Sequence, residues 1–131
     1  MKKFLVKIAL LLLFDTNVYT KDLKFTKIID LDKPWGSSFI NDSEMIITEK
    51  SGKIKIINIK NSNVAKVDHN LNFVESGQGG LLDIIYKDNY LWISYTENRG
   101  NSETSTSIAR GKFNKNKIDF KNIFQANPPI D

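Results

Sequence analysis

The sequence predicts an all-β protein built from short antiparallel strands. From residue 23 onward the apolar residues follow the two-residue period of strands, and no long stretch repeats them at the three- and four-residue spacing of a helix. Short polar turns separate the apolar stretches. In Lys53-Ile54-Lys55-Ile56, lysines occupy one face and isoleucines the other, as in a sheet with one solvated face. The pattern is typical of a sandwich, a barrel or propeller blades.

Each predicted strand is bounded by turn residues. In chain order the predicted strands are 23–29, 37–40, 45–49, 53–58, 64–68, 81–86, 91–96, 107–113 and 118–124. The predicted turns, rich in Asn, Asp, Ser and Gly, are 41–43, 51–52, 61–63, 87–89 and 114–116. The segment 99–106 combines Gly, Asn, Ser and Thr, and we predict a flexible surface loop there.

Residues 1–20 have the pattern of a secretory signal peptide. Lys2 and Lys3 precede an apolar stretch, residues 4–14, that only Lys7 interrupts. Such a stretch is about 16 Å long as a helix, roughly half of a hydrocarbon core. We therefore expect a periplasmic or secreted protein that leaves the membrane after signal removal. A retained N-terminal anchor is the alternative, because residues 18–20 match a cleavage site poorly.

Composition excludes several classes of site. The 131 residues suffice for one small domain, and the net charge of +4 comes from 19 basic and 15 acidic residues. Because Arg99 and Arg110 are the only arginines, we do not expect nucleic-acid binding. The absence of cysteine excludes disulfides and thiolate sites. The only histidine, His69, lacks an identifiable orienting partner, so we expect a solvated loop histidine and assign no catalytic residue and no metal ligand.

The most unusual local sequence is Gly77-Gln78-Gly79-Gly80, which lies just before an apolar strand. It is not a phosphate-binding loop, because no Gly-Lys-Ser/Thr and no helix follow it. It is either a tight structural turn or a loop that faces a ligand. The amide of Gln78 suits a polar, oxygen-rich ligand, and equally suits water. Asp83 is either a buried carboxylate or a partner of turn backbone, and Trp35 and Trp92 are either core residues or stacking surfaces.

Taken in order, four stretches resemble the PQQ-dependent sugar dehydrogenases of the soluble glucose, aldose and sorbosone type. The most specific is Gly77-Gln78-Gly79-Gly80-Leu81-Leu82-Asp83-Ile84. The other similar stretches are 34–54, with Thr48-Glu49-Lys50-Ser51-Gly52 in place of Thr-Glu-Arg-x-Gly, then 91–95 with 107–111, and 123–126. Together they span most of the chain after residue 20.

This resemblance implies a six-bladed β-propeller that binds pyrroloquinoline quinone (PQQ) with calcium. The implied activity is oxidation of the C1 hydroxyl of an aldose sugar to a lactone, with PQQ as hydride acceptor and a separate electron acceptor as partner. In the family the glutamine of the Gly-Gln motif contacts the cofactor, so the resemblance assigns this role to Gln78. The family's catalytic histidine lies in a downstream motif that His69 does not match.

The chain departs from the family pattern in two places. Tyr86-Lys87-Asp88-Asn89-Tyr90 replaces a His-Pro pair and a longer loop, and the sequence ends before the expected base, arginines and calcium ligands. About 111 residues remain after the signal, enough for two to three blades at ~40 to 45 residues each, so the ring is incomplete. We expect residues 21–131 to be the N-terminal portion of a dehydrogenase propeller, inactive alone. The alternatives are a non-catalytic exported module that binds carbohydrate or protein, and a plain β-sandwich.

Overall fold

The computed structural model describes residues 22–130, and every regular element in that part of the chain is a strand. The elements are β1 (Pro34–Asn41), β2 (Glu44–Glu49), β3 (Lys53–Asn58), β4 (Val64–His69), β5 (Leu81–Lys87), β6 (Tyr90–Gly100), β7 (Glu103–Lys112), β8 (Lys117–Ile118) and β9 (Lys121–Gln125). The all-β prediction is confirmed. None of the described residues forms a helix that could cross a membrane. The predicted signal peptide, residues 1–20, lies outside the described part.

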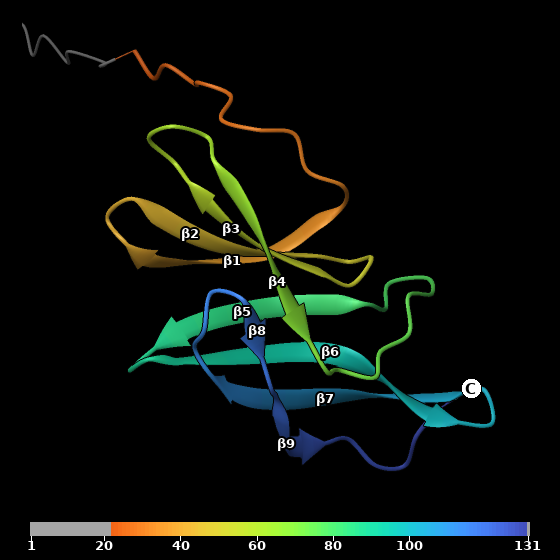
Figure 1. Cartoon of the computed structure of the whole chain (residues 1–131). Coiled ribbons are helices and arrows are strands. Elements are labelled where there is room, and N and C mark those ends of the chain that lie inside the picture. Colours follow the sequence, from red (N-terminus) through yellow and green to blue (C-terminus); the bar gives the residue numbers. More distant parts are fainter. Residues whose placement is uncertain (1–21, 131) are drawn as a thin grey trace, which may run out of the picture.

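The strands form two sheets that lie one above the other (Figure 1). The first sheet has the order β1-β2-β3-β4-β8, with β8 parallel to the end of β4 and all other pairs antiparallel. The second sheet has the order β5-β6-β7-β9 and is antiparallel throughout. Each sheet contains the four-stranded antiparallel arrangement of a propeller blade, and two sheets do not close a ring.

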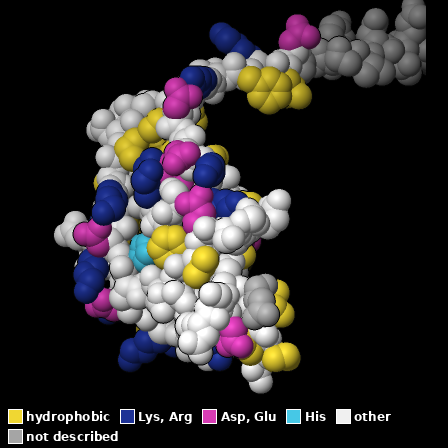
Figure 2. Space-filling view, turned by 90° about the vertical axis from the view of Figure 1, so that its right-hand side faces the viewer, with side chains coloured by type: hydrophobic (Ala, Val, Ile, Leu, Met, Phe, Trp, Pro, Cys, Tyr) yellow, Lys and Arg dark blue, Asp and Glu magenta, His cyan; other side chains and the backbone are white. Residues whose placement is uncertain are grey.

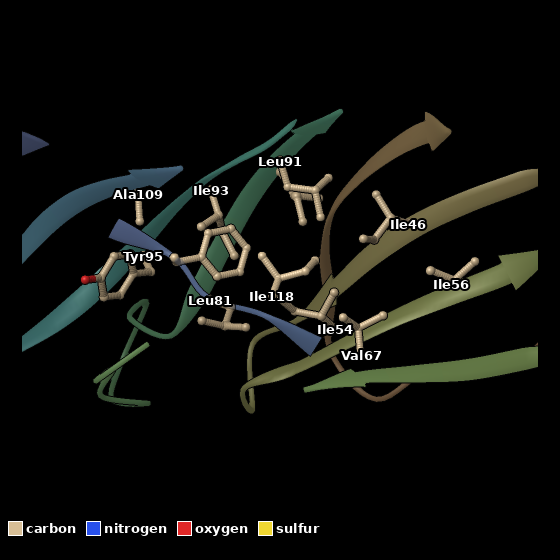
Figure 3. Packing of buried hydrophobic residues seen from close by; sticks show 12 residues of the cluster. Ile46, Ile54, Ile56, Val67, Leu81, Leu91, Ile93, Tyr95, Ala109 and Ile118 are labelled. Atoms are coloured by element: carbon tan, nitrogen blue, oxygen red, sulfur yellow. The ribbon is translucent and has the colours of Figure 1, made fainter. Parts of the chain in front are cut away.

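The core lies between the two sheets, because each sheet turns one apolar face toward the other. Figure 3 shows side chains from both layers meeting, with Ile118 of β8 among them. The fully or nearly fully buried members include Ile46, Ile54, Ile56 and Val67 from the first sheet and Leu81, Ile84, Leu91 and Ile93 from the second. Burial of this surface is the main stabilising contribution available to a chain without disulfides.

The first strands of the two sheets approach each other closely. A Cβ at Gly36 of β1 would lie 2.6 Å from the Cα of Asp83 in β5, so only glycine fits there. Thr48 fills the space beside this contact: its Oγ1 accepts a hydrogen bond from the Gly36 amide at 3.0 Å and donates one to the Leu82 carbonyl. Since each sheet supplies one partner, this hydroxyl joins β1, β2 and β5.

Three predicted elements are wrong. Residues 23–29 alternate like a strand but form none, and Leu23 and Phe25 remain exposed, because the segment pairs with none of the described strands and a side-chain period alone supplies no hydrogen-bonding partner. The predicted loop 99–106 is instead the end of β6, a turn and the start of β7. The predicted strand 118–124 is two strands, since Ile118 pairs with His69 of β4 whereas β9 pairs with β7.

The loop prediction failed because cross-strand pairing overrides local composition. Glu97 pairs with Ser105 and Asn98 with Thr104, so the ladder continues almost to the end of the hairpin. The turn itself is formed by Asn101 and Ser102, both with positive φ, which is the backbone conformation that matches the twist of a two-residue hairpin. The β6–β7 hairpin is therefore an extension of the second sheet, with one register shift between Asn98 and Gly100 just before the turn.

Candidate functional site

The glycine-rich loop, residues 76–80, enters the second sheet directly before β5, and the first sheet holds it through Lys50. The backbone carbonyl of Lys50 accepts a hydrogen bond from the Leu81 amide at 3.3 Å, and its ammonium donates to the carbonyl of Gly77. Lys50 follows β2 directly, so the end of that strand fixes the position of the loop in space.

The second sheet holds the same loop through Thr96 of β6. The Thr96 amide donates to the Gly80 carbonyl at 2.9 Å, and its Oγ1 accepts from the Gly80 amide at 3.2 Å. Its carbonyl accepts from the Val74 amide at 2.9 Å, on the other side of the loop. Five polar groups of two residues, Lys50 and Thr96, thus anchor the loop and its two flanks, and none of these five bonds involves Gln78.

The glycines of the loop have different structural roles. Gly80 has a φ of +145°, and a Cβ there would lie 2.3 Å from the Lys50 carbonyl oxygen. At Gly79 a Cβ would lie 2.8 Å from the Oγ1 of Thr96. Gly77 has a φ of +50° but faces open space. Gly79 and Gly80 therefore permit close packing of backbone, which is the structural-turn interpretation, and they place the residue between Gly77 and Gly79 at the surface.

Gln78 lies exposed at this tip, where it borders an open pocket of about 540 Å³. Its side chain makes no hydrogen bond to another described residue. Trp35 of β1 and the β6–β7 hairpin also line the pocket. The lining residues, none of them charged, are Trp35, Val74, Ser76, Gln78, Gly79, Leu82, Thr96, Ser102, Thr104, Ser105, Thr106 and Ile130. In the view of Figure 2, lysine and arginine side chains lie mainly along the left and in the upper middle of the molecule, with acidic side chains among them.

A carboxylate network supports the β6 strand behind the pocket. Glu97 accepts hydrogen bonds from Ser107 at 2.6 Å, Gln125 at 2.7 Å and Asn122 at 2.8 Å, which joins β6, β7 and β9. Burial acts to raise the pKa of Glu97, but these donors outweigh it and hold the pKa below its ordinary value. Burial raises the pKa of the neighbouring Tyr95, whose hydroxyl donates to Asn122 at 2.7 Å.

A second carboxylate, Glu49, lies next to Lys50 and is fully buried. Its Oε1 accepts from the Lys55 ammonium at 2.6 Å and from the Asp32 amide at 2.8 Å, whereas its Oε2 has only the Lys53 ammonium, at 3.6 Å. Burial acts to raise the pKa of Glu49, and the bonds from Lys55 and Asp32 lower it further than burial raises it. Glu49 is therefore an ionised group that holds the end of β2.

His69 does not belong to the pocket. It lies at the end of β4, half-buried, and not in a solvated loop as expected. Its Nδ1 accepts from the Leu71 amide at 3.2 Å, so its Nε2 carries the hydrogen that it donates to the Gly52 carbonyl at 2.8 Å. Because both ring nitrogens are occupied by backbone, His69 is a structural residue.

The remaining candidate residues, Asp83, Trp92, Trp35 and Gln78, do not all lie together. Asp83 is exposed, and its Oδ1 accepts from the Ile84 amide at 2.9 Å, so it bonds backbone rather than forming a buried carboxylate. Trp92 lies on a face of the second sheet, where the guanidinium of Arg110 lies 5.2 Å from its ring centroid. Trp35 and Gln78 share the pocket, so only these two of the candidates come together.

Sequence reasoning missed Lys50, Thr96 and the hydroxyl groups of the β6–β7 hairpin. Lys50 lies in the Thr-Glu-x-x-Gly turn, whose regular spacing could have marked it, but nothing near Thr96 in the sequence indicates that it contacts residue 80. The hydroxyl-bearing residues 102 and 104–106 lie within the stretch 99–106, for which the sequence predicts a loop. Among residues 22–130 no group of three or more His, Asp and Glu side chains could hold a metal ion.

The chain is similar in sequence to known sugar dehydrogenases. The family model described as glucose/sorbosone dehydrogenase matches residues 31–131. The aldose sugar dehydrogenase YliI of Escherichia coli (strain K12) is 27% identical over an alignment of 109 residues, which covers 76% of this chain and 29% of that protein. The uncharacterized protein slr1608 of Synechocystis is 26% identical over 118 residues, with 79% and 29% covered. The chain thus spans less than a third of these relatives.

Solved structures show the same fold. The crystal structure of the soluble aldose sugar dehydrogenase of Escherichia coli, in its apo form, matches with a TM-score of 0.69 and 27% identity, covering 76% of this chain and 31% of that one. The PQQ-bound aldose sugar dehydrogenase of Streptomyces coelicolor matches in fold with a TM-score of 0.66, at 17% identity, covering 76% and 32%. The two sheets are therefore blades of a dehydrogenase-type propeller, and the chain belongs to the glucose/sorbosone dehydrogenase family.

Proposed function

We propose that this chain contributes part of the site at which a PQQ-dependent enzyme oxidises the C1 hydroxyl of an aldose sugar to a lactone. The observation that carries the proposal is the position of Gln78. In a chain of this family, the glutamine of the Gly-Gln motif lies exposed beside a pocket, on a loop that Lys50 and Thr96 hold from two sheets. Such anchoring suits a contact that must keep its orientation.

The residues present fit one part of PQQ. The quinone offers oxygen atoms as acceptors, and the Gln78 amide could donate to one of them. When bound, PQQ would supply a two-electron acceptor for the hydride. PQQ also carries carboxylates, and the described pocket has no cationic lining residue to pair with them. Gln78 is therefore proposed as a contact for an uncharged edge of the cofactor, and the cations would come from other residues.

The proposed reaction moves a hydride from C1 of the sugar to the cofactor and the hydroxyl proton to a base, and leaves a carbonyl at C1. A general base must lie within hydrogen-bond reach of that hydroxyl. None of the described residues that line the pocket titrates near neutral pH, and His69 is occupied by backbone. The contribution of this chain is thus orientation of the reactants.

The setting of this activity is part of the proposal. We expect the chain to be exported to the periplasm or secreted after removal of residues 1–20. Calcium is expected to assist the cofactor, and a separate electron acceptor is expected to reoxidise it. The chain by itself, residues 21–131, is expected to lack activity.

The test is a titration of PQQ into the purified 131-residue chain, followed by the absorbance of the cofactor. The expected result is saturable binding that Gln78→Ala weakens about three- to tenfold, the value of one or two hydrogen bonds. Gln125→Ala is the matched control, because it removes the other glutamine, which contacts Glu97 away from the pocket. Equal affinity of the Gln78→Ala variant and the wild type would overturn the role of Gln78. Failure of the wild type to bind PQQ would instead favour the alternative, a non-catalytic binding module.

A further inference from the structure

We propose that Lys50 is a positioning residue for Gln78. Its ammonium fixes the peptide group between Gly77 and Gln78, so that the backbone N–H of Gln78 faces the pocket as a second hydrogen-bond donor beside the side-chain amide. The inference rests on the proposed function, since the ligand of these two donors is the cofactor proposed there. It adds one backbone donor and one distant lysine to the contact.

The side chain of Lys50 runs along the glycine-rich loop. At one end, its backbone carbonyl accepts a hydrogen bond from the Leu81 amide at 3.3 Å. A Cβ at Gly80 would lie 2.7 Å from the Cγ of Lys50, so the lysine stem occupies the space that a side chain at residue 80 would need. At the other end, the ammonium donates to the carbonyl of Gly77. The lysine therefore reaches from residue 80 to the peptide group that precedes Gln78.

The backbone of Lys50 is itself held in place. Its amide donates to the Lys33 carbonyl at 3.0 Å, and the preceding residue, Glu49, is fully buried and accepts a bond from Lys55 at 2.6 Å. The Lys33 ammonium in turn donates to Glu75 at 2.8 Å, directly before the loop. These contacts fix the base of the lysine relative to the loop, which limits the positions that its ammonium can reach.

The loop begins with a β-turn whose central peptide needs a partner. The Gly79 amide donates to the Ser76 carbonyl at 2.6 Å and closes the turn. Gly77 has a φ of +50°, whereas Gln78 is not among the residues with positive φ, which is the pattern of a type II′ turn. The closing hydrogen bond does not involve the central peptide group, and glycine permits this group more orientations than other residues would. The bond from Lys50 selects one of them.

This bond also determines the direction of the Gln78 N–H. In a trans peptide the C=O and the N–H point in opposite directions. The peptide between Gly77 and Gln78 is trans, so a carbonyl that faces Lys50 directs this N–H away from Lys50. Three residues of the loop line the pocket, whereas Lys50 and Gly77 do not, so the pocket borders the side of the loop away from the ammonium. Among the described residues the Gln78 N–H has no hydrogen-bond partner, so it is available to a ligand.

Two donors on one residue suit a ligand that offers acceptor oxygens. A backbone N–H only donates, so it selects an acceptor, and the quinone oxygens of PQQ are acceptors. The ammonium of Lys50 polarises the peptide through the Gly77 carbonyl, which strengthens the N–H on its other side as a donor. Lys50 thus acts on the uncharged edge of the cofactor without touching it.

The first measurement uses the isotope-labelled 131-residue chain without cofactor. Amide hydrogen exchange followed by NMR is expected to be fast at Gln78 and slower at Gly79, whose amide is bonded within the turn. Lys50→Met keeps an unbranched stem and removes the ammonium, so it is expected to shift and broaden the resonances of Gly77 and Gln78. Lys50→Arg, which keeps the charge, should return them toward the wild-type positions. The control Lys60→Met removes an ammonium just after β3 and should leave them unchanged.

Two results of this measurement would overturn the positioning role. One is a spectrum in which Gly77 and Gln78 have the same resonances in Lys50→Met and in the wild type. The other is slow exchange of the Gln78 amide in the wild-type chain, since a protected N–H would already have a partner. The second result needs no variant, so it decides the question even if Lys50→Met does not fold.

The second measurement is the titration of PQQ into the same variants. Lys50→Met is expected to weaken PQQ binding about three- to tenfold, and Lys50→Arg to restore most of the affinity. The effect of Lys50→Met should persist in a Gln78→Ala background, because alanine keeps the backbone N–H. PQQ should also slow exchange of the Gln78 amide in the wild type. Unchanged exchange, or loss of the Lys50→Met effect in the Gln78→Ala background, would overturn the second donor.

The two proposals fail in different ways. A wild-type chain that binds no PQQ would overturn the proposed function, and the NMR spectra of the free chain would still decide the role of Lys50. PQQ binding that is weakened by Gln78→Ala but not by Lys50→Met would support the proposed function and overturn the role of Lys50.

Discussion

The glycine-rich loop is held from two sides, and the two sheets hold it by different chemistry. In the first sheet, Lys50 lies next to Glu49, a fully buried carboxylate whose charge is balanced by the ammonium of Lys55. In the second sheet, Thr96 lies next to Glu97, a carboxylate stabilised by hydrogen bonds from the neutral donors Ser107, Asn122 and Gln125.

This difference indicates how each side of the loop can fail. Removing one partner of a buried ion pair strongly destabilises the fold, because the remaining charge is left unpaired and poorly solvated. A carboxylate held by several neutral donors loses one hydrogen bond at a time. We therefore expect the first sheet to be the more sensitive wall of the site, and the second to be the more tolerant.

The largest effect is expected where the two walls meet. Gly80→Ala puts a methyl group 2.3 Å from the Lys50 carbonyl oxygen at a φ of +145°, so we expect the free energy of unfolding to fall by about 4 kcal/mol. Urea denaturation followed by circular dichroism measures it. Gly77→Ala is the matched control, because its φ is also positive but its Cβ would meet open space; its expected loss is about 1 kcal/mol. Equal losses in the two variants would show that packing against Lys50 does not hold the loop.

The next effect compares the carboxylates directly. Glu49→Gln removes the charge that balances Lys55, and we expect it to lower the free energy of unfolding by about 3 kcal/mol. Glu97→Gln keeps the size and an acceptor oxygen, and we expect a loss of about 1 kcal/mol. The same denaturation experiment measures both. A larger loss for Glu97→Gln than for Glu49→Gln would reverse the comparison.

The smallest effect is the dependence of stability on pH. Folding lowers the pKa of both Glu49 and Glu97 from the ordinary value of 4.5. Between the lowered values and 4.5 the unfolded chain binds more protons than the folded one, so the free energy of unfolding rises with pH across this window. The stabilisation is complete above pH 4.5 and is lost as the pH falls through the folded-state values. Urea midpoints measured between about pH 2.5 and 6 report this loss.

Added salt and substitution of the carboxylates separate the contributions of individual Glu residues to this pH dependence. The pKa of Glu44 and of Glu75 is also lowered, in both cases first by a lysine hydrogen bond, but these pairs are more accessible and should be screened by salt. At high salt the remaining acid sensitivity should therefore come mainly from Glu49 and Glu97. Replacing both by glutamine is expected to flatten the profile. An unchanged profile in the double variant would contradict the assignment.

Much of the strand pattern could be predicted because it is a local property. The alternation in Lys53-Ile54-Lys55-Ile56 became β3, with its isoleucines buried, and the turn at Asp88-Asn89 has the positive φ values that these residue types tolerate. The glycine-rich run was recognisable as a special backbone segment, because repeated glycine has few other uses. Family membership also followed from the order of such local segments.

The site itself depended on residues far apart in the sequence. Lys50 and Thr96 meet the glycine-rich loop only because the end of β2 and the middle of β6 lie beside it. The stretch 99–106 is largely strand only because its two halves lie against each other in the β6–β7 hairpin. Residues 23–29 show the opposite case, since their alternation found no partner among the described residues. The alternation of apolar and polar side chains is a property of the sequence. Strand pairing and the walls of a pocket exist only where a second segment lies against the first, so the tertiary structure alone determines them.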